Sequence, residues 1–227
     1  MTATVLPHRA PADDLHWLQS ILGVETAREP VVYLARPSAA EARLLLPVGP
    51  RAAAAAAMRR LHGGRGLRAS IELTGGRLLG RAGLLGLAPG ERVLLPPFEL
   101  VSALGRRLGE PDLTAAVTLG PPRRNRKPVL QLLRPDGLVA GFAKVGWSDL
   151  TRRLVTDEAE ALRAMSGRLP TTVVTPSVVL VERWRELVVS VCTELRPPGG
   201  PTIAAPSVAE VAAGIAAVDR DRRSVAE

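Results

Sequence analysis

The strongest constraint on the fold is a hairpin signal in the middle of the chain. Two apolar runs, residues 128–134 and 137–145, meet at the turn 135–137, which reads Pro-Asp-Gly. Proline presets the backbone of a turn, and glycine accepts the positive φ angle that tight turns between antiparallel strands require. A third strand-like run, 113–119, precedes this pair. The segment therefore predicts three successive antiparallel strands.

A helix and two further strands continue this pattern. Residues 149–166 have apolar side chains at helical spacing, and 172–182 and 186–195 are strand-like runs joined by a tight turn. The order strand, strand, strand, helix, strand, strand predicts an antiparallel five-stranded sheet with one helix after the third strand. The run RPPGGP at 196–201 predicts a linker, and 207–223 a last helix.

The first 112 residues predict a small α/β leading region to which the sequence assigns no role. Its expected strands are 31–37, 41–49, 68–76 and 91–97, and its expected helices are 12–22, 51–64 and 98–109. We therefore divide the chain into a leading region 1–112, a sheet-and-helix unit 113–200, and a linker with the start of a further helix, 201–227. The predicted fold class is α+β.

Composition restricts the compartment and the metal chemistry. Hydrophobic residues make up 46% of the chain, which is typical of a globular protein. Cys192 is the only cysteine, so an internal disulfide is excluded, and no Cys/His spacing suits a metal. The sequence contains neither an 18-residue apolar run nor a signal-peptide pattern at its start. We expect a cytoplasmic protein that does not enter a membrane.

The chain is strongly basic, with a formal net charge of +8. Basic chains bind nucleic acids, anionic lipids or phosphorylated ligands. The densest cluster is 123–127, Arg-Arg-Asn-Arg-Lys, and it is predicted to be either a solvated hairpin tip or a phosphate-binding loop. The chain has only two Phe and one Tyr on which nucleic-acid bases could stack. Nucleic-acid binding through this loop is therefore the weakest of the alternatives.

Two charged residues stand where apolar side chains are expected. Lys144, one of two lysines in the chain beside Lys127, interrupts an apolar strand-like run, and Glu158 interrupts the apolar stripe of the helix that follows. The predicted stripe consists of Leu150, Leu154, Ala161, Leu162 and Met165. A charge on a buried face is destabilising unless an opposite charge meets it. We therefore predict a Lys144–Glu158 ion pair, with two separately solvated side chains as the alternative.

Residues 113–200 resemble the N-terminal lobe of the protein-kinase-like superfamily, in the variety found in aminoglycoside phosphotransferases and related small-molecule kinases. The segment GFAKVG resembles the strand that carries the ATP-contacting lysine. The segment LVTDEAEALRAM is similar to the helix that carries the partner glutamate of that lysine. The segment TPSVVLVERWRELVVSVCTEL looks like the last two strands and the hinge of the lobe.

The resemblance implies specific roles for residues of this chain. Lys144 would orient the ATP phosphates and Glu158 would position Lys144. The hinge, which contacts adenine through its backbone, would be formed by Thr193, Glu194 and Leu195. The loop GPPRRNRKP lacks the glycine-rich pattern of kinases, so Arg124 and Lys127, together with Arg123 and Arg126, would hold phosphate by charge.

The resemblance also implies what the chain lacks. The family carries its catalytic aspartate and its Mg²⁺ ligands in motifs after the hinge, and the residues after Leu195 contain neither motif. We therefore expect a partial ATP-dependent phosphotransferase, a fragment that binds ATP but lacks the C-terminal lobe, with an unknown small-molecule acceptor. The alternative is a non-catalytic kinase-like module that binds a C-lobe or another partner chain. Whether the chain is an enzyme stays open at this point.

Overall fold

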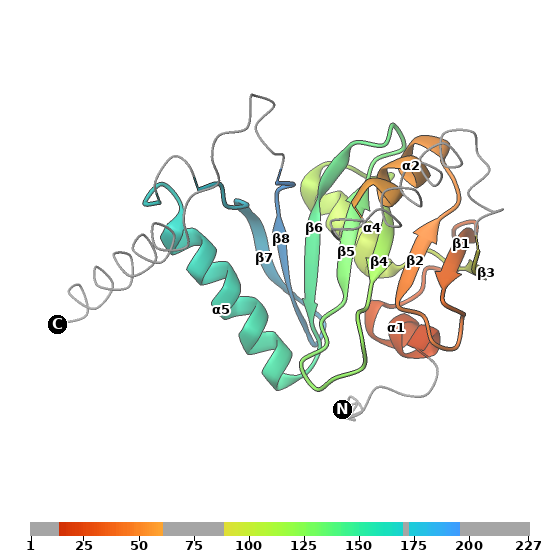
Figure 1. Cartoon of the computed structure of the whole chain (residues 1–227), viewed down its shortest axis with the longest axis horizontal. Helices are drawn as coiled ribbons and strands as arrows, with labels where there is room; N and C mark the ends of the chain where they lie inside the picture. The colour runs from red at the N-terminus through yellow and green to blue at the C-terminus, as the bar shows by residue number, and fades with distance from the viewer. Residues whose placement is uncertain (1–13, 61–88, 170–172, 196–227) are drawn as a thin grey trace, which may run out of the picture.

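The structure, a computed structural model, describes residues 14–60, 89–169 and 173–195. This part of the chain forms one eight-stranded antiparallel sheet and four helices (Figure 1). The strands follow one another across the sheet in the order β3-β1-β2-β4-β5-β6-β8-β7. The strands are β1 (Val31–Arg36), β2 (Leu44–Pro47), β3 (Glu91–Leu95), β4 (Thr114–Thr118), β5 (Val129–Leu133), β6 (Val139–Gly146), β7 (Val178–Trp184) and β8 (Leu187–Cys192). The helices are α1 (Asp14–Leu22), α2 (Arg51–Arg60), α4 (Glu99–Leu108) and α5 (Asp149–Met165).

The predicted α+β class is confirmed, but the predicted count of five strands is wrong. The strands of the leading region extend the same sheet, because β2 pairs with β4 at Leu44–Thr118 and Leu45–Val117. This pairing covers the edge of β4, whose backbone groups would otherwise be open to pairing with another chain. The predicted strand 68–76, the linker 196–201 and the helix 207–223 lie outside the described residues.

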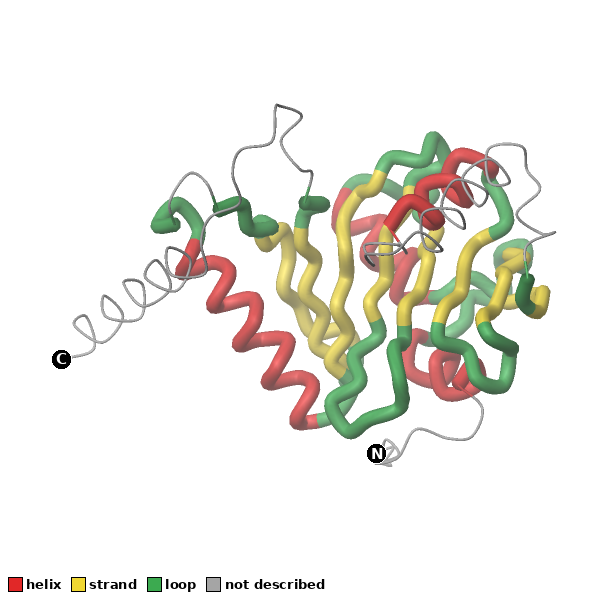
Figure 2. Tube along the Cα trace, viewed as in Figure 1, coloured by secondary structure: helices red, strands yellow, loops and turns green. Residues whose placement is uncertain are grey.

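Helices cover both faces of the sheet (Figures 1 and 2). On the far face in Figure 1, α1 and α4 pack with strand residues into the larger core, which includes Ala143 and Val145 of β6. Side chains alternate along a strand, so Lys144 points to the opposite face, where α2 and α5 lie. One face of the sheet thus carries the larger core, and the opposite face is only partly covered by helices.

The predicted β5–β6 hairpin is confirmed. The N–H of Gly137 donates to the carbonyl of Arg134 at 2.9 Å, and the N–H of Arg134 donates to that of Leu138 at 2.9 Å. Gly137 has a φ of 84°, and a Cβ at this position would lie 2.6 Å from the carbonyl oxygen of Ala52 in α2. Glycine is therefore required twice here, by the turn and by the approach of α2.

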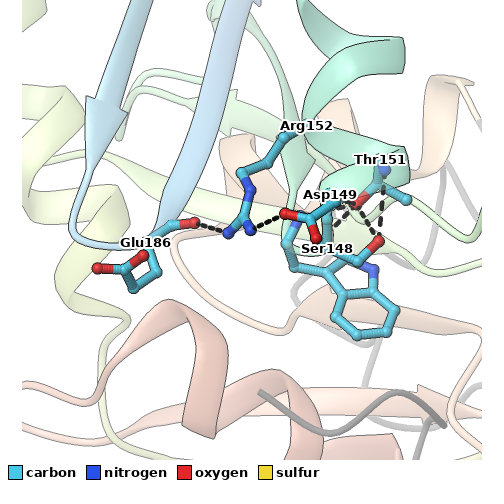
Figure 3. A network of polar contacts seen from close by, with 6 residues as sticks. Ser148, Asp149, Thr151, Arg152 and Glu186 are labelled. Carbon is cyan, nitrogen blue, oxygen red and sulfur yellow. Dashed lines mark hydrogen bonds and ion pairs between the residues drawn. The ribbon is translucent and has the colours of Figure 1, made fainter. Parts of the chain in front are cut away.

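The start of α5 is held to the sheet by a capping box and an arginine. The Ser148 side chain accepts from the N–H of Thr151 at 3.3 Å, and the Thr151 hydroxyl accepts from the N–H of Ser148 at 2.8 Å. Figure 3 shows Arg152 reaching from α5 to both Asp149 and the carbonyl of Glu186, each at 2.6 Å. Because Glu186 lies in the β7–β8 turn, its bond with Arg152 connects the start of the helix to the sheet, whereas the Arg152–Asp149 pair lies within the helix.

The apolar stripe predicted for α5 differs from the face that the structure buries. Thr151, Val155 and Ala159 are the buried residues of the helix, whereas Leu150 is 47% exposed. A Cβ on Gly146 would lie 2.7 Å from the Cα of Arg152, so the first turn of the helix packs directly on the strand. The buried face thus starts at the capping residue Thr151, and the leucines of the predicted stripe lie at the edge of the contact, exposed or half-buried.

Candidate functional site

The predicted ion pair between Lys144 and Glu158 is confirmed. The Lys144 ammonium on β6 donates to Oε1 of Glu158 on α5. The side chains are 28% and 36% exposed, so the pair lies at a surface that a ligand can reach. The helix that follows β6 folds back over the sheet, and this return brings the two residues together.

A second lysine, Lys127, also contacts Glu158, and the sequence did not predict this contact. The ammonium of Lys127, at the end of the β4–β5 loop, lies 3.2 Å from Oε2 of Glu158. One carboxylate thus receives both lysines of the chain, each on a different oxygen. The anion cluster, as we call Lys127, Lys144 and Glu158, carries one net positive charge.

The cluster keeps Glu158 ionised. Partial burial acts to raise the pKa of Glu158, but the hydrogen bonds and charges of Lys144 and then of Lys127 outweigh it, so this pKa lies below its ordinary value. Such half-exposed ion pairs add little to folding stability. The arrangement is better suited to hold two ammonium groups in place for an anion.

An apolar concavity lies beside the anion cluster on the same face. Its volume is about 280 Å³, and its lining residues are Leu44, Ala57, Ala116, Thr118, Val129, Gln131 and Phe142. Val129 is the register partner of Lys144, and Phe142 precedes Lys144 by two residues on the same side of β6. The surface therefore has an apolar part and a cationic end, as a site for a flat ligand with an anionic tail requires.

The predicted hinge residues lie beyond the end of β8, on the Phe142 side of Lys144. Thr193, Glu194 and Leu195 come directly after β8, whose Cys192 is the register partner of Phe142, whereas Ser190 is that of Lys144. Residue 193 is three positions beyond residue 190, a distance of about 10 Å along the chain at roughly 3.3 Å per residue. The N–H of Thr193 donates to the carbonyl of Ser177 at 2.9 Å, so this N–H is already used within the chain.

The loop cations divide into two groups. Arg124 is exposed in the β4–β5 loop, as a phosphate-binding residue would be, and Arg123 is exposed beside it. Arg126 is 1% exposed and lies in the interior, so the suggestion that it contacts phosphate is wrong. Sequence reasoning missed this because its buried partner Asp14 lies 112 residues away. A dense run of arginines has no local signal that distinguishes a buried member.

Cys192, which lies near the cluster, does not supply a reactive thiol to it. Cys192 is buried, and this burial raises the pKa of its thiol, although the charge of Lys144 acts in the opposite direction. The thiol is therefore neutral at ordinary pH, as expected for an inert core cysteine. In the described ranges no group of three or more His, Cys, Asp or Glu side chains is placed to hold a metal ion.

A larger cavity of about 390 Å³ lies on the opposite face, between β1, β4 and α4. Its lining includes the buried Tyr33 and Phe98 and the ion pair of Arg28 with Asp112, whose charged atoms are 3.6 Å apart. Lysines do not line it, and the two acidic side chains Glu29 and Asp112 oppose an anionic ligand. The surface near the anion cluster is therefore the candidate site for a phosphorylated ligand.

No family model matches the sequence, and no curated protein or solved structure is a match for it. Among the described residues, no helix is both long and apolar enough to cross a membrane.

Proposed function

We propose that this surface binds a nucleoside triphosphate, ATP, and that the chain is the nucleotide-binding part of a kinase-like phosphotransferase. The observation that carries the proposal is the convergence of Lys144 and Lys127 on the two oxygens of Glu158, next to an apolar concavity. Adenine and ribose fit the apolar part, and the phosphates fit the cationic end. The order of the predicted hinge, Phe142 and Lys144 along the sheet supports the same orientation of the ligand.

The proposed roles follow from the contacts. Lys144 binds the phosphates, and Glu158 holds its ammonium in a single position, so that less side-chain entropy is lost when the ligand binds. Lys127 and the exposed Arg124 add positive charge from the loop. Val129 and Phe142, which line the concavity, contact the base. Residues 193–195 follow Cys192, the register partner of Phe142, and so would lie near the edge of the base.

Phosphoryl transfer also needs Mg²⁺ ligands and a catalytic base. The described residues do not form a cluster suited to a metal ion, so we assign no step to Mg²⁺ and no catalytic role to any of these described residues. We expect residues 1–227 to bind ATP without transferring its phosphate.

A second candidate function is a non-catalytic module that binds another protein chain. Exposed apolar side chains on α5, on the outer strand β7 and in the segment before β7 favour it, because Leu150, Val179 and Val174 are 47%, 49% and 56% exposed. In this case nucleotide binding would be absent, and the exposed apolar side chains of α5 and the β7 region would contact a C-lobe or another partner.

The test is a calorimetric titration of the full chain with ATP, adenosine and tripolyphosphate. Lys144→Met is expected to weaken ATP binding at least about ten-fold, since it removes a charge-assisted contact to phosphate. Arg153→Met is the matched control, because it also removes one positive charge, from an exposed position on α5, the helix that carries Glu158. Equal ATP affinity in the three proteins, or no ATP binding by the wild type, would contradict the proposal.

A further inference from the structure

Arg126 forms a buried ion pair that joins the leading region to the β4–β5 loop. Its Nη1 donates to Oδ1 of Asp14 in α1 at 2.5 Å, and the two side chains are 1% and 8% exposed. Its Nε donates to the carbonyl of Leu119, where the loop begins, at 3.1 Å, and Nη2 donates to that of Ala42 at 3.4 Å. A single guanidinium thus contacts both α1 and the segment before β2, and it closes the loop on itself.

Two tryptophans contact this arginine, Trp17 at its guanidinium and Trp147 at its main-chain carbonyl. The guanidinium carbon lies 5.1 Å from the ring centroid of Trp17 in α1, and Trp17 meets Trp147 edge to face at 5.3 Å. The indole N–H of Trp147 donates to the main-chain carbonyl of Arg126 at 2.8 Å. Trp147 immediately precedes Ser148, the N-cap of α5. The cluster therefore also fixes the junction between β6 and α5.

The arginine–tryptophan contacts lie next to both partners of the Lys127–Glu158 ion pair. Lys127 follows Arg126 directly, and Glu158 belongs to the helix that starts after Trp147. The loop residues 121–125 are exposed, so the contacts of Arg126 hold the loop from its buried side. In a loop with a single glycine, a glycine-rich backbone cradle cannot provide this order.

We propose that Asp14 and Arg126 are positioning residues for the anion site: they hold the β4–β5 loop so that Lys127 stays on Glu158 and its charge is directed at the ligand. The identity of the ligand rests on the proposed nucleotide function, whereas the positioning of Lys127 does not. The leading region would then be a structural part of the site, because α1 supplies the buried carboxylate.

The positioning is testable without any ligand, because the chain has only two lysines. Protein labelled with ¹³C at lysine Cε gives two side-chain NMR signals, which Lys127→Arg assigns. In the wild-type background, Glu158→Gln is expected to shift both signals, since both ammonium groups contact that carboxylate. In an Asp14→Asn background, Glu158→Gln is expected to shift the Lys144 signal alone.

The control is Glu110→Gln, which breaks the ion pair of Arg134 with Glu110 away from the loop. It is expected to leave both lysine responses intact, so a general loss of stability is distinguished from a loss of positioning. If Asp14→Asn does not fold, the double variant Asp14→Leu/Arg126→Met replaces the pair by apolar side chains, a change that buried ion pairs often tolerate. A Lys127 signal that still responds to Glu158→Gln in a folded Asp14 variant would overturn the proposal.

The ATP titration separates this proposal from the proposed function. Asp14→Asn is expected to weaken ATP and tripolyphosphate binding about five-fold, a usual size for coupling between linked sites, and to leave adenosine binding unchanged. If the wild type does not bind ATP but the Lys127 response is lost in Asp14→Asn, the nucleotide function fails and the positioning stands. If ATP binds equally to both proteins and Lys127 still responds, the positioning fails and the nucleotide function stands.

Discussion

Glu158→Gln separates two explanations of the anion cluster, because they predict opposite signs. If the cluster works by net charge alone, removing a carboxylate strengthens binding of an anion. A unit charge about 8 Å from a phosphate in a solvated site contributes about 0.5 kcal/mol at the dielectric constant of water, which is roughly a two-fold gain in affinity. If Glu158 works by positioning, its loss frees two ammonium groups that it now holds in place.

The positioning explanation predicts a loss of affinity of about ten-fold. In Glu158→Gln the two freed lysines must be ordered when the ligand binds, and this ordering costs about 0.5–1.5 kcal/mol for each side chain. A net loss of about 1.4 kcal/mol after the electrostatic gain corresponds to that ten-fold change. The assay is isothermal titration with ATP and tripolyphosphate near physiological ionic strength, where long-range charge effects are screened.

Asp157→Asn is the matched control for this titration. Asp157 precedes Glu158 on α5 and is exposed, so its loss changes the net charge by the same amount away from the cluster. It is expected to leave ATP affinity unchanged or slightly improved. ATP binding by Glu158→Gln that equals or exceeds that of the wild type would refute the view that Glu158 positions the lysines.

Two further predictions concern stability. The pKa of Glu158 is lowered in the folded chain, so the stability that its ion pairs contribute is present above the ordinary value of 4.5 and is lost as the pH falls through the folded-state pKa. The difference in urea stability between wild type and Glu158→Gln, below about 1 kcal/mol for exposed pairs, should therefore shrink below pH 4.5; a difference that stays constant to pH 3 would contradict the assignment. Gly137→Ala should lower the free energy of unfolding by about 1–3 kcal/mol, because it strains a positive φ and places a Cβ 2.6 Å from the carbonyl oxygen of Ala52. Unchanged urea midpoints for Gly137→Ala would show that the hairpin and α2 shift at little cost.

Several features of this protein follow from local sequence alone. The turn 135–137 and the flanking strands were predictable because proline and glycine restrict the backbone over a few residues. The helix 149–166 was predictable from its period, and it matches Asp149–Met165. The Lys144–Glu158 pair was predictable because each charge interrupts an apolar pattern, the two patterns belong to consecutive elements, and an unpaired charge on a buried face is destabilising.

The face of α5 that contacts the sheet was not predictable from its period. Leucine positions alone place Leu150 on the buried side, but the capping contacts of Thr151 and the close approach at Gly146 rotate the helix otherwise. Hydrophobic periodicity gives the existence of a helix more reliably than its rotation, because partly exposed leucines are common.

The long-range pairings were decided only by the tertiary structure. The pairing of β2 with β4 joins the strands of the leading region to the expected five-stranded sheet, which therefore has eight strands. This pairing depends on which strand edges meet after the chain has folded back. The burial of Arg126 on Asp14 depends on the same folding, since those residues are 112 positions apart. Sequence specifies where charges are along the chain, but whether a charge is solvated or buried depends on which distant segments surround it. The anion cluster shows both cases, because Lys144 was predictable from its own strand and helix, and the contact of Lys127 required the whole fold.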